Sequence, residues 1–318
     1  MHKYPLTRIL LLTLALLPLV GCLKTYHPAH LRMSTANLKE ATLQELVDSI
    51  NTNAARWQSL QATVDIDASF LERKKSRVAE WPQSRGYILV RKPGMLRMKA
   101  LVPVVRNVAF DMVTNGQTFG LSIPPKNEFL SGLDRQPAKP ATEPIWNLRP
   151  RNIYGALLMK AVDESAGEIA VLQEGMEIVK DPKTKKDVQQ PDYEVLVLAK
   201  EGDGYFIARK IVFSRIDLRP RDQSLYNRKG QVVEFVHYDN FADHGGTLFP
   251  EIINIQLPAE DFSVTLSVVK LNLNEPLSDD QFVLEQPPGS KLINVDEHYD
   301  SAESQSSLRA RSPHDPKY

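Results

Sequence analysis

Residues 42–70 read TLQELVDSINTNAARWQSLQATVDIDASF, and this stretch contains the two patterns that decide the fold. In its first half, apolar residues recur every three or four positions, which is typical of one face of an α-helix. In its second half, apolar and polar residues alternate, which is typical of a β-strand with one buried side. The helix that precedes this strand must therefore lie on something apolar.

The helix is predicted from about Leu43 to Gln58. Thr42 and Glu45 match a capping box, in which the threonine hydroxyl accepts a backbone N–H and the glutamate reaches back to the cap. The apolar face then carries Leu43, Leu46, Val47, Ile50, Ala54 and Trp57.

The alternation in 62–70 predicts that Asp65 and Asp67 lie on the solvated face of the strand. From there to about Leu273 the chain reads mostly as strands joined by turns, spaced by about ten residues, which indicates an antiparallel meander. Lys92-Pro93-Gly94 predicts a tight turn, and Asn115-Gly116 is the strongest two-residue hairpin signal. Near Val268-Val269 the alternation changes phase, so a β-bulge is expected there.

Three segments interrupt the predicted strands. Gln136 to Pro144 is a Pro-rich loop, and Lys180 to Gln190 is a polar loop. Between them, Arg151 to Val162 reads as a short helix, although Gly155 inside it costs about 1 kcal/mol relative to alanine. A helix inserted between strands of one sheet is expected to act as a lid or plug.

Residues 7–22 read TRILLLTLALLPLVGC, with a basic head, an apolar middle and a small-residue exit, which together are typical of a secretory signal peptide. Leu19-Val20-Gly21-Cys22 resembles the bacterial lipobox. That resemblance implies cleavage before Cys22 and lipidation of this cysteine, the only one in the chain. We therefore expect the chain to contact a membrane through lipid on Cys22.

The composition is that of a globular protein with a sizeable core: 318 residues, 42% hydrophobic and 25% charged. Lys plus Arg and Asp plus Glu both number 39, so no basic field points to nucleic acid as a partner. The predicted organisation is a signal peptide at 1–21, a tether at 22–37, one domain at 38–289 and a disordered tail at 290–318.

Three segments resemble the periplasmic lipoprotein carrier and outer-membrane lipoprotein receptor superfamily, the LolA/LolB-like proteins, which also includes RseB-type stress sensors. They are Leu43 to Phe70, Asp111 to Phe119 with Ile123 to Asn127, and Val233 to Leu273 with Asp279 to Phe282. These motifs are hairpins and apolar alternation, without a catalytic signature. The resemblance implies a mainly β fold with a few helices, an incompletely closed antiparallel β-barrel with a helical lid.

The resemblance also implies an apolar cavity that takes acyl chains of lipids or lipoproteins. An acyl chain in water is unfavourable by roughly 25 cal/mol per Å², so an aliphatic lining is enough to bind it. Each of the lining candidates is open to a second interpretation, in which it belongs to a closed core. The candidates are Val64, Ile66, Phe70, Met98, Phe110, Met112, Phe119, Leu157, Phe262, Val264 and Leu266.

No motif for catalysis was found. The chain lacks a Gly-x-Ser-x-Gly sequence and the spacing typical of zinc ligands, so we expect no enzyme activity, no cofactor and no metal. His237, Asp239, Asp243 and His244 could approach one another and bind a metal, but they are interpreted as solvated residues near a turn. Four basic residues, Arg73, Lys74, Lys75 and Arg77, form a basic hairpin tip, interpreted as a soluble loop in preference to a contact with anionic head groups.

Two hypotheses of function follow. In the first, a monomeric lipoprotein, anchored in the outer membrane and facing the periplasm, binds or relays lipidated cargo during lipoprotein sorting or insertion. In the second, a non-catalytic structural or sensor lipoprotein uses the same barrel to bind protein partners. The first predicts an open cavity with a movable lid, and the second predicts a filled interior with an exposed apolar patch elsewhere.

Overall fold

The computed structural model describes residues 31–72, 77–134, 148–181 and 183–296. The predicted signal peptide with Cys22, most of the basic hairpin tip and the Pro-rich loop lie outside this part of the chain. The described chain belongs to two compact units, of which the smaller contains residues up to 35 together with 178–190. In that unit β1 (Arg32–Met33) pairs in parallel with Val188 and Gln189.

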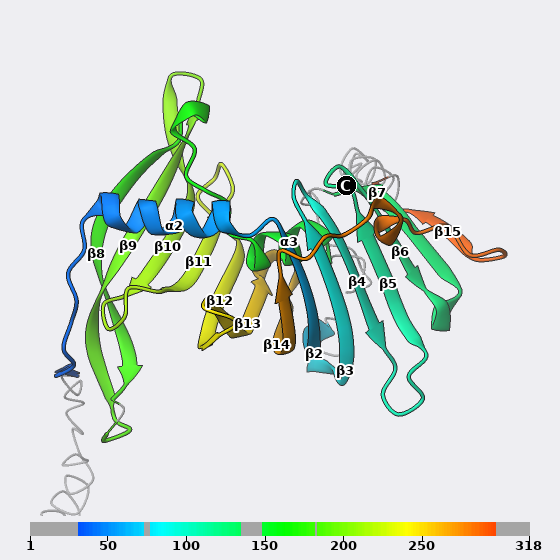
Figure 1. The fold of residues 1–318 in the computed structure, drawn as a ribbon, viewed down its shortest axis with the longest axis horizontal. Helices are drawn as coiled ribbons and strands as arrows, with labels where there is room; N and C mark the ends of the chain where they lie inside the picture. Colours follow the sequence, from blue (N-terminus) through cyan, green and yellow to red (C-terminus); the bar gives the residue numbers. More distant parts are fainter. Residues whose placement is uncertain (1–30, 73–76, 135–147, 182, 297–318) are drawn as a thin grey trace, which may run out of the picture. The chain divides into compact units, whose positions relative to one another are not determined.

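The larger unit, residues 36–177 and 191–318, contains most of two runs of strands, in which neighbours along the chain are also neighbours in the sheet (Figure 1). Residues 178–180 and 187–190, which are ends of two of these strands, belong to the smaller unit. The first run is β2 (Ser59–Glu72), β3 (Arg77–Arg91), β4 (Met95–Leu101), β5 (Val108–Thr114), β6 (Thr118–Ile123) and β7 (Glu128–Leu133). The second run is β8 (Ile169–Lys180), β9 (Asp187–Glu201), β10 (Gly204–Ser214), β11 (Pro220–Tyr226), β12 (Val232–Asp243), β13 (Leu248–Leu257) and β14 (Phe262–Leu273). Adjacent strands of each run are antiparallel.

The two runs are joined where β14 pairs with β2, the last strand of one run beside the first strand of the other. Leu266 lies opposite Ile66, and Leu273 lies opposite Leu60. The sheet order is β9-β10-β11-β12-β13-β14-β2-β3-β4-β5-β6-β7-β15, with β8 also on β9. Among the described strands this order has two ends, so the sheet is open. The predicted fold class, a mainly β chain with an incompletely closed antiparallel sheet and helical cover, is confirmed.

Alternation places one side of each central strand in the core. In β4, Leu96, Met98 and Ala100 are buried, whereas the residues between them are half-buried. The register of β14 on β2 shifts between Val268 and Lys270, which confirms the predicted bulge. The predicted outer face of β2 is also confirmed, because Asp65 lies 2.6 Å from the Arg85 guanidinium there.

Helix α2 (Leu43–Arg56) begins at the predicted capping box. The Thr42 N–H donates to the Glu45 carboxylate at 2.7 Å, and the Glu45 N–H donates to the Thr42 hydroxyl at 3.3 Å. The helix lies across β8, β9 and β10 (Figure 1), and its buried side chains pack against buried residues of β9 and β10. The packed residues include Leu46, Val47 and Ile50 from α2 with Tyr193, Val195, Val197, Ile211 and Phe213 from the strands.

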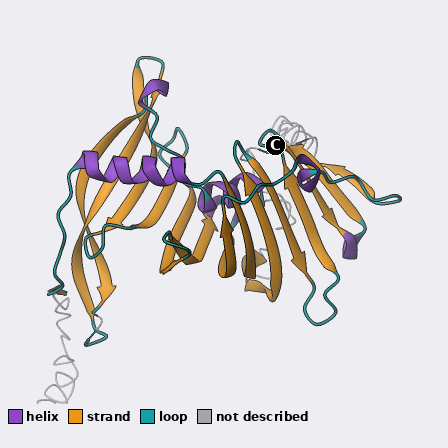
Figure 2. Cartoon of the chain, viewed as in Figure 1, coloured by secondary structure: helices purple, strands orange, loops and turns teal. Residues whose placement is uncertain are grey.

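Helix α3 (Pro150–Leu157) is the inserted helix, and it is shorter than the predicted 151–162. Residues 160–161 leave the helix, and their carbonyl oxygens accept hydrogen bonds from the buried guanidinium of Arg209. Figure 2 shows this helix against the strands near the β2–β14 junction, where it contacts β4, β5 and β13.

Three predicted boundaries need correction. The polar loop at Lys180 to Gln190 is shorter, because β9 begins at Asp187. The strand expected from Val105 begins at Val108, after an exposed loop. The sheet also extends beyond the predicted domain end at 289: β15 (Lys291–Asn294) pairs in parallel with β7, and Ile293 lies in the core.

Candidate functional site

The eleven residues predicted to line a cavity come together in one place. They belong to, or pack against, a single group of apolar side chains from β2 to β7, β12 to β15 and α3, which we call the apolar cluster. Ten are buried and Phe70 is half-buried: the buried ones are Val64, Ile66, Met98, Phe110, Met112, Phe119, Leu157, Phe262, Val264 and Leu266. The structure thus unites residues separated by as many as 200 positions, while their role as a lining stays a prediction.

Strand register explains why these side chains meet. Across the β2–β14 pair, Ile66 faces Leu266 and Phe70 faces Phe262. On the other side of β3, Met98 of β4 faces Met112 of β5. Directly opposed residues point to the same side of a sheet, so these pairs form rows of apolar side chains on one face.

Aromatic rings mark one end of the apolar cluster. The Trp81 ring lies between those of Phe70 and Phe262, with centroid distances of 5.4 and 5.9 Å. Elsewhere in the cluster, the Trp57 ring packs edge-on against Phe249 at 5.3 Å. Both indoles therefore lie where a molecule entering the cluster would change their fluorescence.

Helix α3 covers the apolar cluster with its own apolar side. Ile153, Ala156 and Leu157 are buried, and Leu148 and Leu158 on either side of the helix are buried as well. The helix therefore shields part of the apolar cluster from solvent.

Polar contacts hold α3 at several points. The Arg151 N–H at its start donates to the Asp134 carboxylate at 3.1 Å, and the Tyr238 hydroxyl donates to the Ala156 carbonyl oxygen at 3.0 Å. The Asn152 side-chain amide donates to the Glu234 carboxyl group, and both residues are buried. A short helix of this kind depends on such contacts, since helices this short are not stable in isolation.

Burial shifts the pKa values of the groups under α3. It raises the pKa of Glu234 to about 7, even though the Asn152 hydrogen bond and the charge of Arg151 act in the opposite direction. Burial also raises the pKa of Asp134 and of Tyr238. It lowers the pKa of Arg209, despite the neighbouring charge of Glu168. A buried carboxyl group on β12 with a pKa of about 7 is therefore in direct contact with α3.

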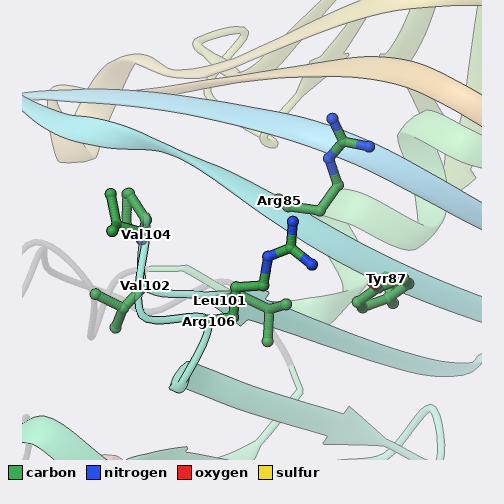
Figure 3. Close-up of a pocket in the computed structure, with 7 residues that line it drawn as sticks. Arg85, Tyr87, Leu101, Val102, Val104 and Arg106 are labelled. Atoms are coloured by element: carbon green, nitrogen blue, oxygen red, sulfur yellow. The ribbon is translucent and has the colours of Figure 1, made fainter.

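A second feature lies at the loop between β4 and β5, outside the apolar cluster. A pocket of about 310 Å³ is lined there by residues 102–104 and Arg106 of this loop together with Arg85, Tyr87 and Leu101 (Figure 3). Val104 is 97% exposed and Val105 63%, so the loop presents an apolar tip. In Figure 3 the side chains of Arg85 and Arg106 lie beside one another, away from Val104, and Arg85 is paired with Asp65 at 2.6 Å.

The 102–106 loop holds a strained conformation. Val104 has φ +69° and Arg106 has φ +57°, in the left-handed region that β-branched residues rarely adopt. Backbone hydrogen bonds close the loop, from Val102 N–H to the Asn107 oxygen at 2.7 Å and from Arg106 N–H to the Val102 oxygen at 3.0 Å. Sequence reasoning missed the extent of this loop, because the next strand was predicted to begin at Val105; Pro103 within an apolar run was the available signal.

The residues considered for a metal do not gather. His237 Nδ1 lies 2.6 Å from Asp222, Asp243 accepts from the Gly246 N–H within a turn, and His244 lies 3.9 Å from Glu251. In the described part of the chain, no group of three or more His, Cys, Asp or Glu side chains is arranged to hold a metal ion. Among the same residues, no helix is both long and apolar enough to cross a bilayer.

Comparisons with known proteins return likenesses among solved structures. No family model matches the chain, and no curated protein does. A LolA superfamily protein from Nitrosomonas europaea matches with a TM-score of 0.46 at 14% identity, over 77% of this chain and 99% of the other. A putative outer membrane lipoprotein-sorting protein domain from Vibrio parahaemolyticus gives 0.46 at 10% identity, over 76% and 97%. A DUF1329 family protein from Desulfovibrio piger gives 0.49 at 15% identity, over 76% and 95%.

The superfamily that the sequence resembles thus recurs among these solved structures. All three TM-scores lie below 0.5. The strand order and register of this chain therefore define its fold. These define a class of protein: an open antiparallel sheet with one apolar face covered by a short, polar-anchored helix.

Proposed function

We propose that this protein is a membrane-anchored envelope lipoprotein that binds acyl chains of lipids or lipoproteins, and that it acts in lipoprotein sorting or insertion at the outer membrane. The observation that supports it is the apolar cluster itself, a continuous apolar sheet face whose cover is one short helix. The 102–106 loop adds support, because an exposed apolar tip in a loop that also carries Arg106 suits contact with the interface of an anionic bilayer.

A comparison of burial free energies supports the idea that an acyl chain can take the place of α3 and its flanking leucines. Leu148, Ile153, Leu157 and Leu158 contribute about 2 kcal/mol each by burial, or about 8 kcal/mol together. An acyl chain contributes about 0.8 kcal/mol per buried methylene, so about ten methylenes offset the displaced segment. Common membrane acyl chains exceed that length, which makes exchange between helix and ligand energetically feasible.

The test uses a soluble form that begins at Leu23 and has no lipid of its own. A brominated fatty acid quenches tryptophan fluorescence on contact, so binding at the apolar cluster is expected to give saturable quenching at about one ligand per chain. Trp81→Phe and Trp57→Phe should each remove part of that signal. Organic extraction of the gently purified protein is expected to yield acyl lipid in a similar ratio.

The specificity control compares two neighbours on β14. Leu266 is fully buried, and Leu266→Glu introduces a charge into the cluster, whereas Ser267→Glu introduces the same charge on the opposite face. The first substitution should abolish quenching in protein whose circular dichroism stays native, and the second should leave it intact. An extract without lipid, together with an unquenched parent protein, would contradict the proposal.

A specific observation favours the second candidate, a lipoprotein that binds protein partners. Besides the buried interior, apolar residues are exposed on β8 and β10: Ile169 (43%), Val171 (41%), Tyr205 (50%) and Ile207 (39%). A pocket of about 370 Å³ adjoins them, lined in part by Leu43 and Val47 of α2. If this patch binds a protein, a photo-crosslinker at Val171 should capture one defined partner in cells, whereas one at Leu292, which is more exposed at 56%, should not.

A further inference from the structure

Two buried oxygen atoms between α3 and β12 have no hydrogen-bond partner among the described residues. They are Oε1 of Glu234 and Oδ1 of Asn152. Both residues are 3% exposed, and the other atoms of the same two groups are already joined, because Asn152 Nδ2 donates to Glu234 Oε2. A buried polar atom without a partner is costly by about 1–3 kcal/mol, so two in one contact need an explanation.

One proton on Glu234 would give both of these oxygen atoms a hydrogen bond. An ionised carboxylate can only accept hydrogen bonds. The free oxygen of an ionised Glu234 and the amide oxygen of Asn152 would therefore be two acceptors with no donor between them. A neutral carboxyl group has an O–H, and a planar acid and a planar primary amide have complementary edges. The amide N–H donates to one acid oxygen, and the acid O–H donates to the amide oxygen. Both orphan oxygens are then satisfied.

We propose that Glu234 and Asn152 form a proton-dependent latch that holds α3 on the sheet, and that loss of the Glu234 proton loosens the helix. The latch is well placed for this, because Asn152 lies in the helix that covers the apolar cluster and Glu234 lies on a strand beneath it. The further step, that the latch controls ligand entry, rests on the proposed function.

Other charged groups face the pair. Arg151 of α3 favours the charged form of Glu234, whereas Glu260, in the turn between β13 and β14, disfavours it. On the same strand, Tyr238 stays neutral at these pH values, since burial raises its pKa. The burial effect dominates, which is why the pKa of Glu234 rises from 4.5 to about 7.

The direction of the pH effect follows from linkage. With α3 closed, Glu234 keeps its proton up to about pH 7, whereas with α3 open and the carboxyl in water it loses the proton near 4.5. The closed position of α3 is therefore favoured most below pH 4.5, and this preference is lost as the pH rises from 4.5 to about 7. Between pH 5.5 and 7.5 the open-to-closed ratio should rise about 20-fold.

Hydrogen exchange of the α3 backbone amides measures this ratio without any ligand. The full chain, held in nanodiscs, is compared at pH 5.5 and 7.5 after correction for intrinsic exchange, and the parent should lose protection at 150–157 about 20-fold. Glu234→Gln mimics the protonated acid, since its amide offers one donor and one acceptor, so α3 in this variant should stay protected at both pH values.

The matched control is Glu251→Gln. Glu251 accepts a hydrogen bond from the Asn240 side-chain amide at 2.7 Å, which is the same type of contact on the exposed surface. This substitution should leave the pH response of the parent protein intact. Asp134, which accepts from the Arg151 N–H at the start of α3, also has a raised pKa, so a small residual pH response is expected in both variants, Glu234→Gln included. A second readout is the infrared carbonyl band of a protonated carboxyl, which should disappear from the parent near pH 7 and be missing from Glu234→Gln.

The outcomes separate the two proposals. A pH-independent α3 in the parent, or a 20-fold response that persists in Glu234→Gln, would overturn the latch. If Glu234→Gln fails to fold, absence of the infrared band from the parent at pH 5.5 would overturn it instead. None of these measurements has acyl-chain binding as its readout, so the latch can hold even if the fatty-acid test fails, and the reverse is equally possible.

Discussion

At the scale of single residues, some side chains have a backbone conformation or a degree of exposure that destabilises the fold. Val104 is the clearest on the surface: it is a β-branched, almost fully exposed residue in a left-handed conformation. Such residues are costly by about 1–3 kcal/mol, and their occurrence is typical of functional sites. The cost indicates that the apolar tip of the loop has a role other than stability.

Val104→Asn should therefore improve stability and weaken membrane contact at the same time. Asparagine tolerates φ > 0, so the free energy of unfolding in urea is expected to rise by about 1 kcal/mol. Binding to anionic vesicles should fall, because a polar group replaces the apolar tip.

The neighbouring Val105 is the control, as it is 63% exposed without positive φ. Val105→Asn should weaken vesicle binding with no gain in stability. If Val104→Asn instead destabilises the fold, the assignment of strain to this residue is wrong.

His237 gives a second residue-scale prediction. Its hydrogen bond with Asp222 raises the pKa of the imidazole above the ordinary 6.5, although partial burial acts in the opposite direction. The stabilisation is fully present below 6.5 and is lost as the pH rises through the raised value. An NMR titration of the His237 ring should show this raised pKa in the parent and a return toward 6.5 in Asp222→Asn, and an unchanged midpoint would contradict the pairing.

At the scale of elements, the patterns of the chain predicted which segments become helices and strands better than where they end. The capping box at Thr42, the alternation in β2 and the bulge in β14 are local signals, and the structure confirms them. Strand β15 was missed, because a four-residue strand has little alternation and its partner β7 lies about 160 residues away. The start of β9 was missed for a similar reason, since Asp187 to Gln190 is polar.

Some residues of the candidate site could be predicted from the sequence, and others could not. The apolar cluster was predictable because its members alternate along strands, which identifies one face of each. Glu234 was not, because on β12 it shares a face with Val236 and Tyr238, while Val233 and Phe235 make the other face equally apolar. Which side is buried there depends on α3, and that contact joins positions about 80 residues apart.

The cap of α2 provides a prediction for this scale. Thr42→Ala removes the hydroxyl that accepts the Glu45 N–H and should lower the free energy of unfolding by about 1 kcal/mol. Thr42→Ser keeps the hydroxyl and should cost much less. Chemical denaturation measures both, and equal losses in the two variants would show that the methyl group, rather than the cap, matters.

At the scale of the whole molecule, the larger unit has a core shared by distant parts of the sequence. Leu60 in β2 and Ile293 in β15 belong to the same apolar cluster. Ile293→Ala should therefore lower the free energy of unfolding by about 2–3 kcal/mol, whereas Leu292→Ala, at a residue 56% exposed, should change it by less than about 0.5. Similar small effects from both would mean that β15 adds nothing to the core.

The pairing of β2 with β14 also has a consequence for biosynthesis. A chain made from its amino end exposes one edge of β2 as soon as β3 has docked, yet the strand that covers this edge is completed only at Leu273. During that interval the nascent protein carries an apolar, unpaired edge, which is the kind of surface that aggregates. Such a nascent chain would need a holding chaperone until more than 200 residues of it have emerged.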